Sequence, residues 1–98
     1  MIKYFLLSML CVSNIFAATI PPIPKELVDQ TVTMIIPWPP GGDTDATQRF
    51  VVEQVAKLTG LKITVINKGG AGGIIGAREL AKSRPDGLTI MGHSNETV

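Results

Sequence analysis

The sequence has little of the material that catalysis or nucleic-acid binding requires. It contains one cysteine, one histidine and one tryptophan, and its aromatic content is 5%. Nine Lys and Arg residues against eight Asp and Glu residues give a formal net charge of +1, without any basic run. We therefore expect no nucleic-acid partner. The single histidine, His93, and its neighbour Ser94 have no third partner at a recognisable spacing, so no catalytic triad can be assembled.

The first 17 residues have the layout of a secretory signal peptide. Lys3 lies near the start, an apolar core runs from Tyr4 to Phe16, and small residues follow from Ala17. The apolar core is shorter than the roughly 20 residues that a membrane-spanning helix needs. We therefore expect export, with cleavage near Ala17, and the alternative is a buried or membrane-anchoring helix.

The single cysteine, Cys11, falls inside this segment. It follows Leu10, whereas the processing of exported lipoproteins requires a small residue at that position. We therefore expect Cys11 to be removed with the signal peptide and not to carry a lipid. Disulfide bonds and thiol chemistry are then excluded for the mature chain.

Beyond the signal peptide, the chain predicts a proline-rich leader followed by one small α/β unit. Residues 18–30 contain three prolines and predict an extended leader. The apolar patterns then predict strands at 31–37, 61–67 and 88–92, with helices at 45–60 and 73–84. This β-α-β-α-β order indicates a parallel sheet with right-handed crossovers. The apolar stripe expected on the first helix comprises Ala46, Phe50, Val51, Val55 and Leu58.

The fold class also predicts where a ligand binds. In open parallel α/β sheets, ligands bind outside the carboxyl ends of the strands. The segments that follow the three predicted strands are "PWPPGGDTD", "NKGGAGG" and "GHSNETV". We expect these three loops to meet at one edge of the sheet, with His93 and Ser94 acting as hydrogen-bonding partners of a ligand or as turn residues.

The first loop favours an anion. Gly41 and Gly42 allow close approach of the backbone, and the next helix presents the positive end of its dipole there. Asp45 could cap this helix by accepting from the amide of Gln48, as in a capping box, or it could belong to the ligand shell. Asp43 would repel an anion unless it binds water, a ligand ammonium group or a second set of amides.

Two further interpretations of the first loop concern metal binding and Trp38. Asp43 and Asp45 alone supply too few oxygen ligands for a calcium site, so we expect no metal. Trp38 could form an apolar wall at the rim of a cleft, with its indole N–H available, or it could pack in the core.

The second loop suggests a different function. Gly70, Gly72 and Gly76 lie between a predicted strand and a helix, close to the dinucleotide-binding pattern, although the last spacing is one residue too long. The acidic residue expected about 20 positions further on could only be Glu96, beyond the third strand. A fragment of a dinucleotide-binding enzyme is therefore a weaker alternative, and we expect no cofactor.

Three motifs in order resemble a known family. "PWPPGGDTD", "NKGGAGGIIG" and "PDGLT" are similar to the patterns P-F-x-x-G-G-x-x-D, N-[RK]-x-G-A-G-G-x-x-G and P-D-G-[YL]-T of the substrate-binding receptors of tripartite tricarboxylate transporters, the Bug family. The resemblance runs from about Val32 to Met91. It implies a periplasmic, non-catalytic receptor of the two-lobed type II class, which binds a small carboxylate and delivers it to membrane permease subunits. Family ligands include dicarboxylates, tricarboxylates, acidic amino acids and aromatic acids.

The resemblance also assigns ligand-binding positions, mainly to main-chain amides of the first glycine pair. The residues carried across are Trp38, Pro40, Gly41, Gly42, Thr44 and Asp45 in the first loop and Gly70, Ala71, Gly72 and Gly73 in the second. Asp43, His93 and Ser94 complete the predicted site from their position in the loops. The family pattern has a small or neutral residue at position 43, so Asp43 mildly favours a ligand that carries an amine.

Length is the larger departure from the family. Family members are much longer, so we expect residues 31–98 to form part of a first lobe, with the second lobe absent from this chain. Such a fragment would bury little ligand surface and would be weakly stable. A nonfunctional, truncated remnant of a receptor is the corresponding alternative function.

Overall fold

The structure, a computed structural model, describes residues 19–94. The predicted signal peptide, with Cys11 and the cleavage position near Ala17, lies outside the described residues, and so does Glu96. Within the described part of the chain, no helix combines the length and the apolar character that crossing a membrane requires.

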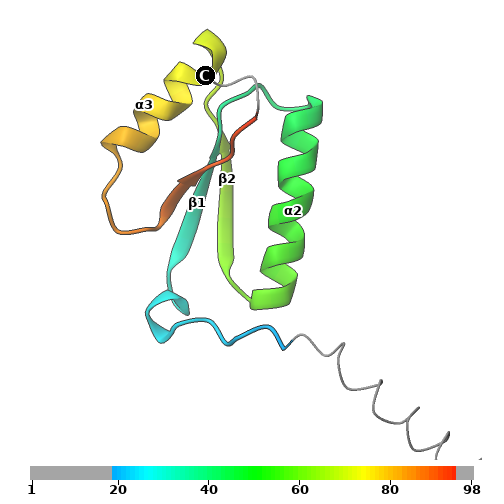
Figure 1. The fold of residues 1–98 in the computed structure, drawn as a ribbon, viewed down its shortest axis with the longest axis vertical. Coiled ribbons are helices and arrows are strands. Elements are labelled where there is room, and N and C mark those ends of the chain that lie inside the picture. The colour runs from blue at the N-terminus through cyan, green and yellow to red at the C-terminus, as the bar shows by residue number, and fades with distance from the viewer. Residues whose placement is uncertain (1–18, 95–98) are drawn as a thin grey trace, which may run out of the picture.

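The described chain forms the predicted α/β fold around a three-stranded parallel sheet (Figure 1). Strand β1 (Thr31–Ile36) lies in the centre, between β2 (Lys62–Asn67) and β3 (Thr89–Met91). Helix α2 (Asp43–Thr59) connects β1 to β2, and helix α3 (Ile74–Lys82) connects β2 to β3. The two helices flank the sheet on opposite sides (Figure 1). This follows because α2 leads from β1 to one edge strand, α3 leads back across β1 to the other edge strand, and both crossovers are right-handed.

The strand register aligns the carboxyl ends of the sheet. β1 pairs with β2 over six residues, from Thr31 with Lys62 to Ile36 with Asn67. Its pairing with β3 is shorter and ends with Ile35 opposite Met91. The three strands therefore end at nearly the same level, and the loops that follow them begin side by side.

The core is small and is centred on β1. Its buried apolar side chains are Val32, Ile35 and Ile36, and Pro37 is also fully buried. β-branched residues suit a central strand that is covered by a helix on each face. The leader differs slightly from the prediction, because a single 3-10 turn, η1 (Lys25–Leu27), interrupts the expected extended chain.

The predicted packing stripe of α2 is wrong. Phe50 and Leu58 are 63% and 64% exposed, and Val51 and Val55 also face solvent. The less exposed side of the helix instead carries Asp45, Val52 and Ala56, which lie on one face because they are seven and four residues apart. Asp45 bonds to the end of β2, as described below, and this contact fixes which face of the helix turns toward the sheet.

The carboxyl end of α2 agrees with the prediction, whereas its amino end does not. Gly60 ends the helix in a left-handed conformation, with φ 74°, and its amide donates to Ala56 O, which confirms the predicted cap. The helix begins at Asp43, two residues before the predicted start, and Gly42 is its N-cap. A second 3-10 turn, η2 (Ala71–Gly73), precedes α3.

Candidate functional site at the amino end of helix α2

The loops after the three strands are joined by hydrogen bonds that continue the sheet pattern. The amide of Lys68 donates to Ile36 O at 2.8 Å, and the amide of Gly92 donates to Ile35 O at 2.9 Å. The first loop is therefore held between the second and the third, which supports the convergence expected from the sequence.

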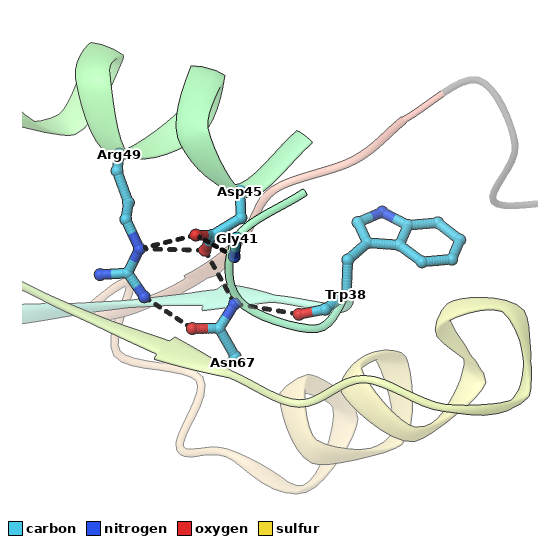
Figure 2. A network of polar contacts seen from close by, with 5 residues as sticks. All are labelled: Trp38, Gly41, Asp45, Arg49 and Asn67. Carbon is cyan, nitrogen blue, oxygen red and sulfur yellow. Dashed lines mark hydrogen bonds and ion pairs between the residues drawn. The ribbon is translucent and has the colours of Figure 1, made fainter. Parts of the chain in front are cut away.

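A buried carboxylate organises the first loop. Asp45 is only 5% exposed, although it lies in the first turn of a surface helix. Its Oδ1 accepts from Asn67 Nδ2 at 2.8 Å and from Arg49 Nε at 2.9 Å. Its Oδ2 accepts from the amide of Gly41 at 3.1 Å (Figure 2). These donors come from β2, α2 and the first loop, so one carboxylate connects three segments of the chain.

Asn67 extends the network to the backbone of the first loop. Its Nδ2 also donates to Trp38 O at 2.9 Å, and its Oδ1 accepts from Arg49 Nη2 at 2.6 Å. In Figure 2 the indole of Trp38 points away from the carboxylate, so only the main chain of this residue joins the network.

The network keeps Asp45 ionised. The hydrogen bond from Asn67 lowers its pKa most, and the amide of Gly41 lowers it further; burial acts in the opposite direction, and the Arg49 guanidinium adds to the lowering. Because all of these groups donate, they favour the charged carboxylate over the protonated acid. Asp45 is therefore an anion at neutral pH whose charge Arg49 balances.

The predicted capping box is wrong. Asp45 lies within the helix and accepts from Gly41, whereas the capping box required it to accept from the amide of Gln48. Gln48 does not reach back; its Nε2 lies 3.5 Å from His93 O, and its side chain lies against Gly92. Helix α2 therefore begins without a side-chain cap.

This helix start leaves backbone donors without a partner inside the helix. The first intrahelical hydrogen bond runs from Ala46 N to Gly42 O at 3.0 Å. The amides of Asp43, Thr44 and Asp45 precede it and therefore have no partner within the helix. Together with the helix dipole, they form a positive surface suited to an anion.

Two adjoining depressions open at this point and share Asp43 and Thr44. One is lined in addition by Trp38, Pro39, Pro40, Gly42 and Asp45. The other is lined in addition by Thr47, Gln48, His93 and Ser94. The structure thus brings most of the predicted residues of the first and third loops together around the start of α2. Gly41 lines neither depression, and its amide donates to Asp45 Oδ2.

Trp38 lies at the rim of the first depression and is half-buried. Its position is therefore intermediate between the cleft wall and the core packing that the sequence left open. Its Nε1 is buried and has no hydrogen-bond partner within the described chain. Among the same residues, no group of three or more His, Cys, Asp or Glu side chains could hold a metal ion.

The chain is similar to known proteins over about two thirds of its length. No protein-family model matches the chain. Protein BugT of Bordetella pertussis is 42% identical over 60 residues, which are 61% of this chain and 18% of BugT. A UPF0065 protein from the tcbD-tcbE intergenic region of Pseudomonas sp. strain P51 is 39% identical over 67 residues, 68% of this chain and 20% of that protein. The solved structure of the periplasmic binding protein BugD superposes with a TM-score of 0.60 at 40% identity, over 64% of this chain and 21% of BugD. The chain is a relative of the Bug proteins. The structure of a periplasmic transporter gives the same TM-score at 43% identity.

The matches also define how much of a Bug protein is present here. The chain spans about one fifth of the length of the relatives it matches. The fold and the first-loop geometry described above therefore concern that fifth of the Bug architecture.

The second Bug-like motif has a packing role in this structure. Gly70, Ala71, Gly72 and Gly73 line neither depression. A Cβ on Gly76 would lie 2.8 Å from Pro37 Cβ, and one on Gly69 would lie 3.0 Å from Pro39 N. Small residues here let α3 and the second loop approach the first loop. A ligand-binding role of residues 70–73 stays a prediction.

Sequence reasoning missed three residues of the site, Gln48, Arg49 and Asn67. Arg49 could have been found from its i, i+4 spacing to Asp45, which favours an ion pair on a helix. Asn67 carried a weaker signal, since it is a polar residue at the end of an apolar strand. Gln48 was noted only as part of the capping box.

Proposed function

We propose that this chain forms one wall of a periplasmic solute-binding site that captures a small carboxylate for a membrane transporter. The observation that carries the proposal is the uncapped start of α2, where Asp43 and Thr44 line both depressions and Asp45 lines one of them. The relatives named above include a periplasmic binding protein and a periplasmic transporter, which supports the same class of function.

The physical argument concerns charge at the start of α2. A carboxylate there accepts hydrogen bonds from amides whose dipoles already point outward, so little reorganisation is needed. The nearest buried anion, Asp45, is balanced by Arg49 at 2.9 Å and does not leave an uncompensated negative charge. The loop therefore presents donors to a ligand in spite of its two aspartates.

Side chains around these amides would select among acids. Trp38 offers an apolar ring beside the first depression, and Thr44, which carries a hydroxyl, lines both depressions. Asp43 is exposed and carries a negative charge at the same place. A ligand with both a carboxylate and an ammonium group fits this combination better than a simple dicarboxylate does.

The remaining parts of the proposal follow from the sequence patterns and from the resemblance to the Bug family. The chain is exported through its signal peptide at 1–17, its leader spans 18–30, and residues 31–98 form part of a first lobe. Its partners are the small carboxylate and the permease subunits of the transporter, and it has no catalytic role.

A binding experiment tests the proposal. The protein obtained from expression of the full chain is titrated with succinate, citrate, glutamate and benzoate at millimolar concentrations, while the emission of Trp38, the one tryptophan, is followed. We expect a saturable change with at least one acid and none with succinamide, the uncharged counterpart of succinate. A response to NAD⁺ and to no acid would favour the dinucleotide alternative and refute the carboxylate site.

A further inference from the structure

We propose that Asp45 is a positioning residue: its carboxylate, with Asn67 and Arg49, fixes the Trp38–Gly42 loop against the end of β2 and does not itself bind the ligand. The effect on ligand affinity rests on the function proposed above, whereas the effect on the loop does not.

The contacts of the carboxylate support this role. Oδ1 has two donors, Asn67 Nδ2 and Arg49 Nε, and Oδ2 has the amide of Gly41 and a second, longer contact of 3.1 Å from Arg49 Nε. Both oxygens are thus occupied by groups of the protein, and the residue is buried. A further donor from a ligand would have to displace one of these partners.

The network also determines the position of Trp38. Asn67 is oriented by Arg49 on its oxygen and by Asp45 on its nitrogen, and the same nitrogen holds Trp38 O. Loss of the carboxylate therefore removes one of the two constraints on Asn67 and loosens the carbonyl that anchors the tryptophan.

The hydrogen bond from the Gly41 amide to Asp45 changes the site expected from the sequence. The amide of Gly41 was predicted to meet the ligand, but it donates to Asp45 Oδ2. The donors left for a carboxylate include the amides at 43–45, which have no partner within the helix and begin two residues further along the chain. The Asp45 carboxylate thereby holds the amide that shapes the loop, while the amides at 43–45 have no partner within the helix.

The test compares Asp45→Asn with the matched control Glu53→Gln. Glu53 also forms an i, i+4 ion pair on α2, with Lys57 at 2.7 Å, but its side chain is 60% exposed. An asparagine at position 45 offers one acceptor oxygen to three donors, and its amide would face other donors. Both substitutions remove one negative charge, so any difference in their effects is due to where the carboxylate lies in the structure and not to the loss of charge.

The measurement is amide hydrogen exchange, with Trp38 emission as a second signal. In Asp45→Asn we expect the Gly41 amide to exchange about tenfold faster or more, since hydrogen bonds to charged groups are among the stronger ones. We also expect the emission of Trp38 to shift. The amide of Lys68, which bonds to Ile36 O at the edge of the sheet, serves as the internal reference and should keep its rate. Glu53→Gln should change none of these signals.

A variant-free measurement covers the case in which Asp45→Asn does not fold. In the unmodified protein, the chemical shift of the Gly41 amide and the emission of Trp38 should titrate together in acid. The charged group in contact with Asp45 is Arg49, and the contacts from β2 and from the first loop are neutral. The nearest other acid along the helix is Asp43. Independent titrations of the two signals would overturn the positioning role.

The outcomes separate this inference from the proposed function. If Gly41 and Trp38 respond as expected and no carboxylate binds, the positioning role stands and the carboxylate site is refuted. If Asp45→Asn folds and leaves Gly41 exchange and Trp38 emission unchanged, the positioning role is overturned, whatever the binding result.

Discussion

Replacement of Gly42 by serine should raise stability slightly and weaken carboxylate binding. Gly42 is the N-cap of α2, with φ −81° and ψ 171°, which are the extended angles that a serine cap adopts. No atom lies within 4 Å of a Cβ built at this position. The serine Oγ can therefore accept from the amide of Thr44 or Asp45, which are the second and third residues of the helix.

The size of the two effects follows from the same hydrogen bond. A serine N-cap is only a few tenths of a kcal/mol better than glycine, so the gain in unfolding free energy should be about that size. A ligand carboxylate, by contrast, loses one charge-assisted hydrogen bond, and such bonds contribute about 1.5 to 3 kcal/mol. At the lower end this corresponds to an increase in Kd of about tenfold.

The assay combines urea unfolding with titration by the acid that gives the largest Trp38 response. Gly42→Ala is the matched comparison, because it adds a Cβ without an acceptor and is a poorer cap than glycine or serine. We expect serine to be the more stable of the two variants and alanine to retain the higher affinity. If affinity instead followed stability, with serine binding more tightly than alanine, the amides at 43–45 would not be the carboxylate donors.

Three further predictions concern packing and pH. Gly76→Ala places a Cβ 2.8 Å from that of the buried Pro37. The overpacking should cost about 1 to 3 kcal/mol, which exceeds the gain of about 1 kcal/mol in helix propensity, so urea unfolding should show a net loss of unfolding free energy. A Cβ in Gly92→Ala has the flexible side chain of Gln48 as its nearest neighbour, so the substitution should change the unfolding free energy much less while moving the amide signals of the site. Asp45 has a lowered pKa in the folded state, so its stabilising effect is complete above the unfolded value near 4 and is lost as pH falls through the lower folded value. The stability difference between the unmodified protein and Asp45→Asn should therefore shrink in acid melts, and a constant difference down to pH 3 or so would contradict the assignment.

The sequence predicted those parts of the structure that depend on local patterns. The strand and helix order, the parallel sheet and the glycine cap at Gly60 follow from periodicity and turn chemistry along short segments. The meeting of the first and third loops followed from a general rule for parallel sheets.

The rotation of α2 and the role of Asp45 could not be predicted in this way. Both depend on Asn67, which is 22 residues away in the sequence and reaches the helix only once β2 pairs with β1. A pattern of apolar residues favoured the face that carries Phe50 and Leu58, but a polar contact at the first turn turned that face to solvent. Local capping rules likewise assigned Asp45 to Gln48, because the distant donors are not visible in a single helix pattern.

The most direct test of the central claim is a residue-resolved amide titration of the protein with succinate and glutamate. We predict saturable shifts of the amides of Asp43, Thr44 and Asp45. Saturable shifts confined to residues 70–73, or none at residues 43–45 at millimolar acid, would contradict the assignment of a carboxylate site to the start of α2.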